Sequence, residues 1–166
     1  MGFARADITE DKFMGGDLML MQPRHGYRAG VDPVFLAASI AAHAGESVLD
    51  LGCGAGAAAL CLGRRVPGLK LVGVERQGDY ADLARMNAFD NEIDMEVFTA
   101  DLAELPAELR EDSFDHVIMN PPFHLRHRGT VSTDDGKGEG KFEETPLATW
   151  IDVATRRLKP KGHLTL

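Results

Sequence analysis

The segment 48–56, with the sequence VLDLGCGAG, constrains this chain more than any other stretch. An apolar run ends at Asp50, passes three alternating glycines at 52, 54 and 56, and enters an alanine-rich run at 57–62. This order predicts a strand, a tight turn and a helix start. Glycines let the backbone approach a ligand closely or adopt positive φ, and a helix N-terminus presents unpaired N–H groups. The segment is therefore typical of a nucleotide-cofactor turn.

Two cofactor classes fit this turn. The spacing of Gly52, Gly54 and Ala57 matches the dinucleotide fingerprint, so an NAD site is possible by spacing alone. Asp50 disfavours a pyrophosphate because both carry negative charge, whereas S-adenosylmethionine has no phosphate and carries ammonium and sulfonium cations. A turn that binds nothing is the third reading, disfavoured because one glycine would suffice to make it.

Composition limits the class of protein. The chain has 166 residues, 44% of them hydrophobic, which suits one domain over 1–166. The net charge of −8 disfavours nucleic-acid binding through a broad basic face, although a local basic patch remains possible. No apolar run approaches the roughly 20 residues of a membrane span, and the first residues do not resemble a signal peptide, so we expect a cytoplasmic protein. Cys53 and Cys61 lack C-x-x-C spacing and predict neither a disulfide framework nor a zinc site.

The first 45 residues predict an extension built from a hairpin and a helix. Residues 1–12 carry no strong pattern, whereas 13–23 suggests two short extended pieces around a Gly-Gly-Asp turn. Asp32 is a suitable N-cap and Pro33 a suitable first residue for an apolar helix over 34–43. We expect this helix start and Tyr27 to line the cofactor pocket.

From residue 47 onward strands alternate with helices. The predicted strands are 47–51, 69–74, 95–99, 114–119 and 161–166, and the predicted helices run from the glycine turn to about 65, over 79–90 and over 147–158. This alternation predicts an α/β fold with a doubly wound, mainly parallel sheet. Ligands of such sheets lie at the carboxyl ends of the strands, where Asp50, Glu75, Asp101 and Asn120 occur.

The chemistry of these side chains suits one nucleoside cofactor. Glu75 is able to accept hydrogen bonds from both ribose hydroxyls, and Asp101 from an adenine amino group. Each carboxylate alone would more often be a solvated loop residue. Their occurrence at consecutive strand ends favours a shared site.

The tetrapeptide Asn120-Pro121-Pro122-Phe123 follows a predicted buried strand. Two prolines remove two backbone donors, stiffen the chain and leave carbonyls free to accept. Asn120 offers an amide oxygen, and Phe123 offers a face for stacking a flat ring. The motif thus predicts a site for a planar amine; the alternative is a rigid strand exit with a packing aromatic.

Together these motifs resemble those of Rossmann-like S-adenosylmethionine-dependent methyltransferases of the amino-methylating type. The segment 22–32 resembles the start of the tRNA1(Val) adenine-37 N6-methyltransferases. The resemblance implies strand order 3-2-1-4-5 and S-adenosylmethionine as the cofactor. It also implies an exocyclic amine as the methyl acceptor, with adenine N6 in tRNA as the preferred candidate. It implies catalytic roles for Asn120, Pro121, Pro122 and Phe123. The implied cofactor-binding residues are Tyr27, Arg28, Asp32, Asp50, Gly52, Gly54, Glu75, Asp101 and Asn120.

Other functions remain open at this point. His124 after Phe123 also resembles the rRNA guanine-N2 methyltransferases. An NAD-dependent oxidoreductase and a catalytically inactive cofactor-binding module are alternatives of a different class. Enzymes with similar Asn-Pro-Pro motifs also methylate glutamine side chains of proteins, but the length of this chain leaves no room for a separate peptide-binding domain.

A basic segment follows the tetrapeptide. Together with Phe123, the side chains of His124, Arg126 and Arg128 are predicted to bind the RNA substrate, with ordinary loop charge as the alternative. His124 and His127 are spaced for a metal, but no further ligand is nearby, so no metal is expected.

The end of the chain departs from the resembled family. The family sheet continues beyond its fifth strand with a helix and an antiparallel pair, so strands 6 and 7 would be absent here. We therefore expect 161–166 to be an edge strand covered by missing sequence or by another chain. A fragment of this kind would keep much of the cofactor pocket and have weakened or no methyl transfer.

Overall fold

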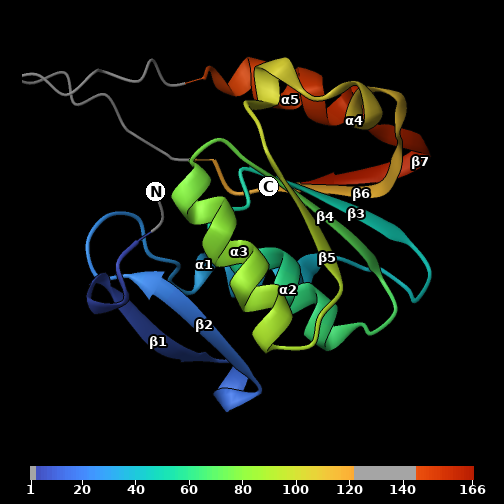
Figure 1. Ribbon diagram of the computed structural model, residues 1–166. Helices are drawn as coiled ribbons and strands as arrows, with labels where there is room; N and C mark the ends of the chain where they lie inside the picture. Colours follow the sequence, from blue (N-terminus) through green and yellow to red (C-terminus); the bar gives the residue numbers. More distant parts are fainter. Residues whose placement is uncertain (1–2, 122–144) are drawn as a thin grey trace, which may run out of the picture.

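The computed structural model describes residues 3–121 and 145–166, and its centre is a five-stranded sheet (Figure 1). The strands lie in the order β5-β4-β3-β6-β7, and every neighbouring pair is parallel. The α/β class with a mainly parallel sheet is confirmed. The strands are β3 (Ser47–Leu51), β4 (Lys70–Glu75), β5 (Met95–Thr99), β6 (Phe114–Met119) and β7 (Leu158–Thr165).

Strand β3 is central because its side chains are apolar on both faces. Val48 packs into the core on one side of the sheet, and Leu49 and Leu51 pack into the core on the other. All three are fully buried, as expected for a strand covered on both faces. Asp50 shares the face of Val48, because side chains alternate along a strand, and it is therefore buried as well.

Helices cover both faces of the sheet (Figure 1). Buried leucines and alanines of α1 and α2 pack against one face, and α4 and α5 pack against the other. The first group is α1 (Asp32–Ser39), α2 (Ala57–Arg65) and α3 (Gly78–Asp90). The second group is α4 (Ala107–Glu111) and α5 (Leu147–Arg156), and the 3-10 turn η3 (Leu102–Glu104) precedes α4.

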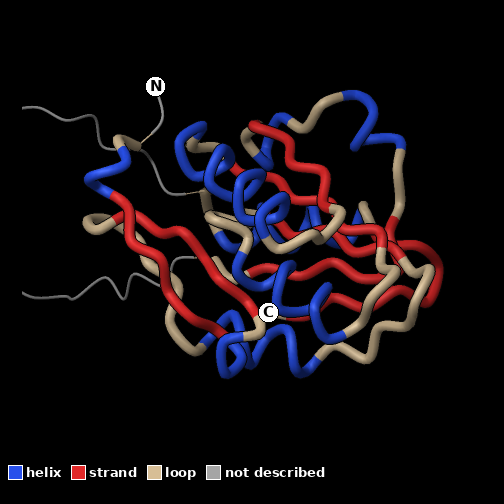
Figure 2. The backbone as a smooth tube through the Cα atoms, turned by 60° about the horizontal axis from the view of Figure 1, so that its bottom comes forward, coloured by secondary structure: helices blue, strands red, loops and turns tan. Residues whose placement is uncertain are grey.

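An antiparallel hairpin lies beside α3, apart from the main sheet (Figures 1 and 2). It consists of β1 (Ile8–Phe13) and β2 (Leu18–Pro23), with the 3-10 turns η1 (Arg5–Asp7) before it and η2 (Met14–Gly16) between its strands. The side-chain amides of Asn87 on α3 and of Asn91, which caps the end of α3, exchange hydrogen bonds with the backbone of Met21 and Met19, at 2.6 to 3.0 Å. These amides satisfy the polar edge of β2, which attaches the hairpin to the helix layer.

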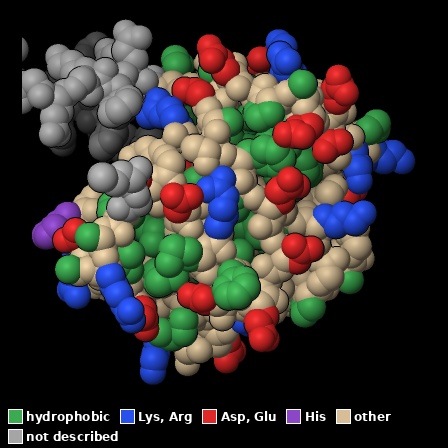
Figure 3. All heavy atoms as spheres, viewed as in Figure 1, with side chains coloured by type: hydrophobic (Ala, Val, Ile, Leu, Met, Phe, Trp, Pro, Cys, Tyr) green, Lys and Arg blue, Asp and Glu red, His purple; other side chains and the backbone are tan. Residues whose placement is uncertain are grey.

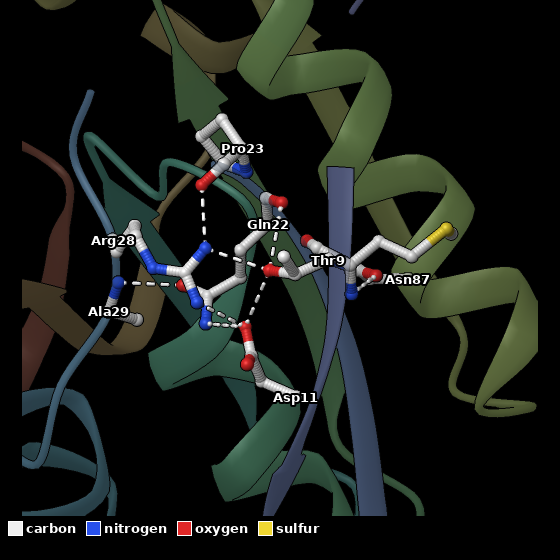
Figure 4. A network of polar contacts seen from close by, with 8 residues as sticks. Thr9, Asp11, Gln22, Pro23, Arg28, Ala29 and Asn87 are labelled. Carbon is white, nitrogen blue, oxygen red and sulfur yellow. Dashed lines mark hydrogen bonds and ion pairs between the residues drawn. The ribbon is translucent and has the colours of Figure 1, made fainter. Parts of the chain in front are cut away.

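A polar network joins the hairpin to the segment before α1 (Figure 4). Arg28 donates to the hydroxyl of Thr9 and to the carboxylate of Asp11, each at 2.7 Å. Gln22, which is buried, donates to the same Asp11 carboxylate and accepts the backbone N–H of Ala29. The chain that leads toward Tyr27 and α1 is therefore fixed by hairpin side chains.

The N-terminal part differs from the sequence expectation in two respects. The first hairpin strand begins at Ile8, inside the segment that showed no strong pattern, because its partner β2 and not its own periodicity defines it. Helix α1 begins at Asp32 and ends at Ser39 instead of spanning 34–43. The carbonyl of Val31 accepts the first helical N–H groups, and the side chain of Asp32 makes no capping bond.

The C-terminal part also differs. Helix α5 ends at Arg156, and β7 begins at Leu158, earlier than the predicted 161. A register irregularity opposite Phe114–His116 and a positive φ at Lys161 interrupt the alternation on which the sequence reading depended. The five-residue helix α4 was not expected, since one turn gives almost no periodic signal.

Strand β7 lies at one edge of the described sheet, where it pairs with β6 alone. Leu164 is half-buried against the core below, whereas Leu166 is 57% exposed. No helix within 3–121 or 145–166 has both the length and the apolar character needed to cross a membrane.

Candidate functional site

A cavity of about 620 Å³ lies at the carboxyl ends of β3, β4 and β6. This is the place where parallel α/β sheets bind ligands, and the volume falls within the ordinary range for small-molecule sites. The sequence-predicted residues on its wall are Tyr27, Asp32, Gly52, Gly54, Glu75, Asp101, Asn120 and Pro121.

The glycine turn adopts a backbone that other residues rarely tolerate. Gly52, Gly54 and Gly56 have φ values of +68°, +56° and +86°. The N–H groups of Gly52 and Cys53 both donate to the carbonyl of Val74 at the end of β4, at 2.8 and 3.0 Å. All three positions have a left-handed backbone, which favours glycine at each of them, whereas a simple turn would need only one glycine.

Glu75 is held at the mouth of the turn. Its Oε2 accepts the backbone N–H of Gly54 at 3.0 Å, and its Oε1 accepts that of Gln77 at 2.8 Å. The side chain is only 8% exposed. Because a carboxylate has about four acceptor positions, the two backbone bonds fix its orientation and leave capacity for ligand hydroxyls.

Asp50 lies deeper, in a small recess that also borders Tyr27, Gly52 and Asn120. Burial raises the pKa of Asp50 to about 7, and the negative charge of Glu75 adds to this, while a hydrogen bond from the backbone of Ala59 opposes it. Within the described residues its Oδ2 atom is buried without a hydrogen-bond partner. A buried carboxylate oxygen of this kind favours a donor or a cation as its missing partner.

Asp101 occupies the end of β5. Its Oδ1 accepts the backbone N–H of Ala103 at 2.9 Å, and its Oδ2 lies 3.9 Å from the guanidinium of Arg76. The side chain is more than a third exposed toward the cavity side, so it remains accessible to a ligand.

Asn120 and Tyr27 are joined directly. The Nδ2 atom of Asn120 lies 3.3 Å from the phenol oxygen of Tyr27 and donates to it. The hydroxyl of Tyr80 donates to the backbone carbonyl of Tyr27 at 3.0 Å. The three residues come from the loop after the hairpin, from α3 and from the end of β6, and they meet at the cavity wall.

Two aromatic wall residues were missed by sequence reasoning. Trp150 on α5 packs its indole against Gly52, and Tyr80 on α3 lies beside Tyr27. Neither carries a local motif; their helix positions are ordinary amphipathic ones. Only the packing of α3 and α5 on the sheet brings them to the glycine turn.

Other predicted residues lie elsewhere. The guanidinium of Arg28 is bound in the hairpin network, with Thr9, Asp11 and the carbonyl of Pro23 as partners, which supports a structural role (Figure 4). The predicted residues Pro122, Phe123, His124, Arg126 and Arg128 lie outside the described residues.

The described residues contain no group of three or more His, Cys, Asp or Glu side chains able to hold a metal ion. A wider groove of about 1090 Å³ lies between the hairpin and α3, with Arg24, Arg85 and Asp82 on its wall. It holds none of the predicted site residues.

The fold and this cavity are those of an α/β protein that binds a nucleotide-type cofactor. The chain belongs to the methyltransferase small domain family, whose pattern matches residues 30–166. This confirms the methyltransferase resemblance and argues against the oxidoreductase alternative that glycine spacing alone allowed.

Relatives with assigned functions are methyltransferases as well. A tRNA1(Val) (adenine(37)-N6)-methyltransferase of Porphyromonas gingivalis is 33% identical over 99% of this chain and 62% of its own length. A release factor glutamine methyltransferase of Aliivibrio fischeri is 40% identical over 47% of this chain and 27% of its own length. The chain therefore spans less than two thirds of either relative.

Solved structures agree on the fold. The T. thermophilus 16S rRNA N2 G1207 methyltransferase, in complex with AdoMet and guanosine, superposes with a TM-score of 0.68 and 25% sequence identity. The match covers 95% of this chain and 40% of that one.

Proposed function

We propose that this chain binds S-adenosylmethionine in the cavity and transfers its methyl group to an exocyclic amine. The preferred candidate for this acceptor is adenine N6 of a tRNA. The observation that carries the proposal is that Glu75 and Asn120 line the cavity at the glycine turn, while Asp50 lies in the small recess that Asn120 also borders. Membership of a methyltransferase family and a relative with this tRNA activity support it.

The residues present fit the cofactor. Glu75 is fixed by two backbone donors and keeps acceptor capacity for the ribose hydroxyls, and Asp101 at the next strand end offers an acceptor for the adenine amino group. The unpartnered oxygen of Asp50 is suited to the cationic part, because a positive charge favours the ionised carboxylate. Tyr27 and Asp32 contribute the opposite wall.

The cofactor supplies a methyl group activated by a sulfonium. In the proposed reaction the Oδ1 atom of Asn120 and the carbonyl of Pro121 accept the two N–H groups of the substrate amine. These bonds orient the nitrogen lone pair toward the methyl group and stabilise the pyramidal nitrogen. With the cofactor bound, the new N–C bond would form as the S–C bond breaks, the electron pair of that bond would remain on sulfur, and the amine would then lose one proton to solvent. No strong base is required, because the methylated amine is acidic before it loses that proton.

The RNA substrate is part of the same proposal. Phe123 would stack on a base turned out of its loop, and His124, Arg126 and Arg128 would contact phosphates. On the face drawn in Figure 3, Lys and Arg side chains are interspersed with Asp and Glu and form no continuous basic surface. That face therefore offers no broad electrostatic surface to RNA, and in this proposal local contacts near the cavity hold the RNA. A cytoplasmic location accords with such a substrate.

A second candidate is guanine N2 of rRNA. The structural match to the T. thermophilus rRNA enzyme favours it, as does the His124 that follows Phe123. Both candidates use the same cavity within a single domain over 1–166, with 1–45 as its N-terminal extension and strand order 3-2-1-4-5 as in Rossmann-like methyltransferases.

Two experiments test the proposal. In calorimetric titration, micromolar binding of S-adenosylhomocysteine without binding of NAD is expected, and the reverse result would overturn it. Mass spectrometry of nucleosides from a deletion strain separates the substrates, since loss of N6-methyladenosine from tRNA supports the first candidate and loss of N2-methylguanosine from rRNA selects the second. If the protein binds the cofactor and neither RNA loses a methylated nucleoside, the result supports the alternative of a catalytically inactive cofactor-binding module.

A further inference from the structure

We propose that Tyr27 is a positioning residue for Asn120 and that its phenol oxygen sets which end of the amide faces the acceptor amine. The proposal rests on the proposed function for its chemistry, but the contact itself is independent of that function. Asn120 donates from Nδ2 to the Tyr27 oxygen at 3.3 Å. With Nδ2 directed to the phenol, Oδ1 is the amide atom left to accept from a substrate.

Tyr27 is held where this contact requires it. Its backbone carbonyl accepts the hydroxyl of Tyr80 at 3.0 Å, and its ring edge lies against Gly54 of the glycine turn. A side chain at Gly26 would place a Cβ 2.8 Å from the Tyr80 hydroxyl, so the glycine before Tyr27 allows that hydroxyl to approach. The hydrogen bond from Tyr80 therefore holds the backbone of Tyr27, and the ring, although the residue is 55% exposed, has one edge beside the glycine turn.

The charges around Tyr27 favour the phenol as acceptor from Asn120. Burial raises the pKa of Tyr27, the hydrogen bond from Asn120 opposes this rise, and the carboxylate of Asp32 adds to it, so that the net shift is upward and the phenol keeps its proton. The negative charge of Asp32 attracts the phenol hydrogen, which leaves an oxygen lone pair for the Nδ2 donor. The opposite arrangement, with the hydroxyl donating to Oδ1, would turn an NH₂ group toward the substrate and repel an amine.

This orientation has a consequence for specificity. An amide oxygen accepts from an amine but not from a carbonyl oxygen, so the site favours exocyclic amines over base carbonyls. The preference follows from Tyr27 as well as from Asn120, because an amide without a fixed partner is able to present either end.

The first test needs no activity. Phe in place of Tyr27 keeps the ring and removes the oxygen. In ¹⁵N-labelled protein the side-chain amide peaks of Asn120, identified by their loss in Asn120→Asp, are expected to move in Tyr27→Phe. Unmoved peaks would overturn the proposal even if the protein methylates RNA.

The second test separates positioning from cofactor binding. Tyr27→Phe is expected to slow single-turnover methyl transfer about tenfold at saturating S-adenosylmethionine, the effect of one hydrogen bond on the transfer step itself. In an Asn120→Ala background the same change should cost nothing further. An unchanged transfer rate at saturating cofactor, or full additivity with Asn120→Ala, would overturn the positioning role. Absence of transfer by the unchanged protein would instead contradict the proposed function and leave the amide-peak test to decide this inference.

Discussion

The indole of Trp150 lies directly on the Cα atom of Gly52. A Cβ built on Gly52 would meet the Cη2 atom of Trp150 at 2.5 Å and its Cζ3 atom at 2.9 Å. The contact joins α5 to the turn after β3, and both residues line the cavity. Gly52 thus serves two needs at once, a positive φ and close approach of an aromatic ring.

Gly52→Ala is expected to displace Trp150 and to weaken S-adenosylhomocysteine binding by tenfold or more, with a loss of about 1–3 kcal/mol in the free energy of unfolding. Gly15→Ala is the matched control, because Gly15 has a similar φ of +72° but no atom within 4 Å of its built Cβ. Calorimetry and urea denaturation measure the two effects. Equal behaviour of both variants would show that backbone strain, and not the contact with Trp150, limits position 52.

Asp50→Asn is expected to change how stability depends on pH. The folded protein keeps the Asp50 proton up to about pH 7, whereas the unfolded chain loses it near its ordinary pKa of 3.8. The folded state therefore binds the extra proton between these values, and stability falls with rising pH by up to about 1.4 kcal/mol per unit, then levels above pH 7.

Because Asn does not titrate, the difference in unfolding free energy between Asp50→Asn and the unchanged protein should grow in favour of the variant from pH 4 to 7 and then stay constant. Urea denaturation at pH 5, 6, 7 and 8 measures it, with the exposed Asp112→Asn as control. A difference that does not vary with pH would contradict the raised pKa.

Glu75→Gln should weaken S-adenosylhomocysteine binding by about tenfold and lower stability by about 1–3 kcal/mol. The two oxygens of Glu75 accept different backbone N–H groups, and the amide nitrogen of Gln would face one of these donors. Glu108→Gln, on the exposed side of α4, is the control. Unchanged affinity and stability would mean that the two backbone bonds do not hold the site.

Asn87→Ala is expected to destabilise the fold by about 2–4 kcal/mol. Its side chain accepts from the N–H of Met21 and donates to the carbonyls of Met21 and Ala55, so its loss leaves buried polar groups without partners. Phe89→Ala on the same helix is the control, since Phe89 is 83% exposed. Similar losses for both variants in urea denaturation would show that helix propensity, not the amide contacts, decides the result.

The sequence predicted the parallel sheet well because its strands are short apolar runs between clear turn signals. The bounds of β5 and β6 agree with the expectation, and Glu75, Asp101 and Asn120 were placed at strand ends by topology alone. The periodicity of apolar residues did not predict the start of β1, because pairing with β2 defines that strand. It also did not predict the start of β7, because the irregular backbone at Lys161 interrupts the alternation of apolar and polar residues.

The site was predictable where residue type and strand position suffice. The roles of Trp150 and Tyr80 depend on how α5 and α3 pack, and the partners of Arg28 depend on the register of β1 and β2. Such contacts join segments far apart in the sequence, and no local pattern encodes them.

The hairpin lies before the region that defines the family, which begins at residue 30. Yet Asn87 binds the hairpin at Met21 and the glycine turn at Ala55 through one amide group, and Tyr27 reaches Asn120 from the loop behind it. A protein trimmed to the family boundary would keep the glycines and the carboxylates but lose Tyr27 and its contact with Asn120. The boundary of the family, at residue 30, therefore separates the hairpin and Tyr27 from Asn87 and Asn120, which they contact. A protein made to study or engineer this site should include the hairpin.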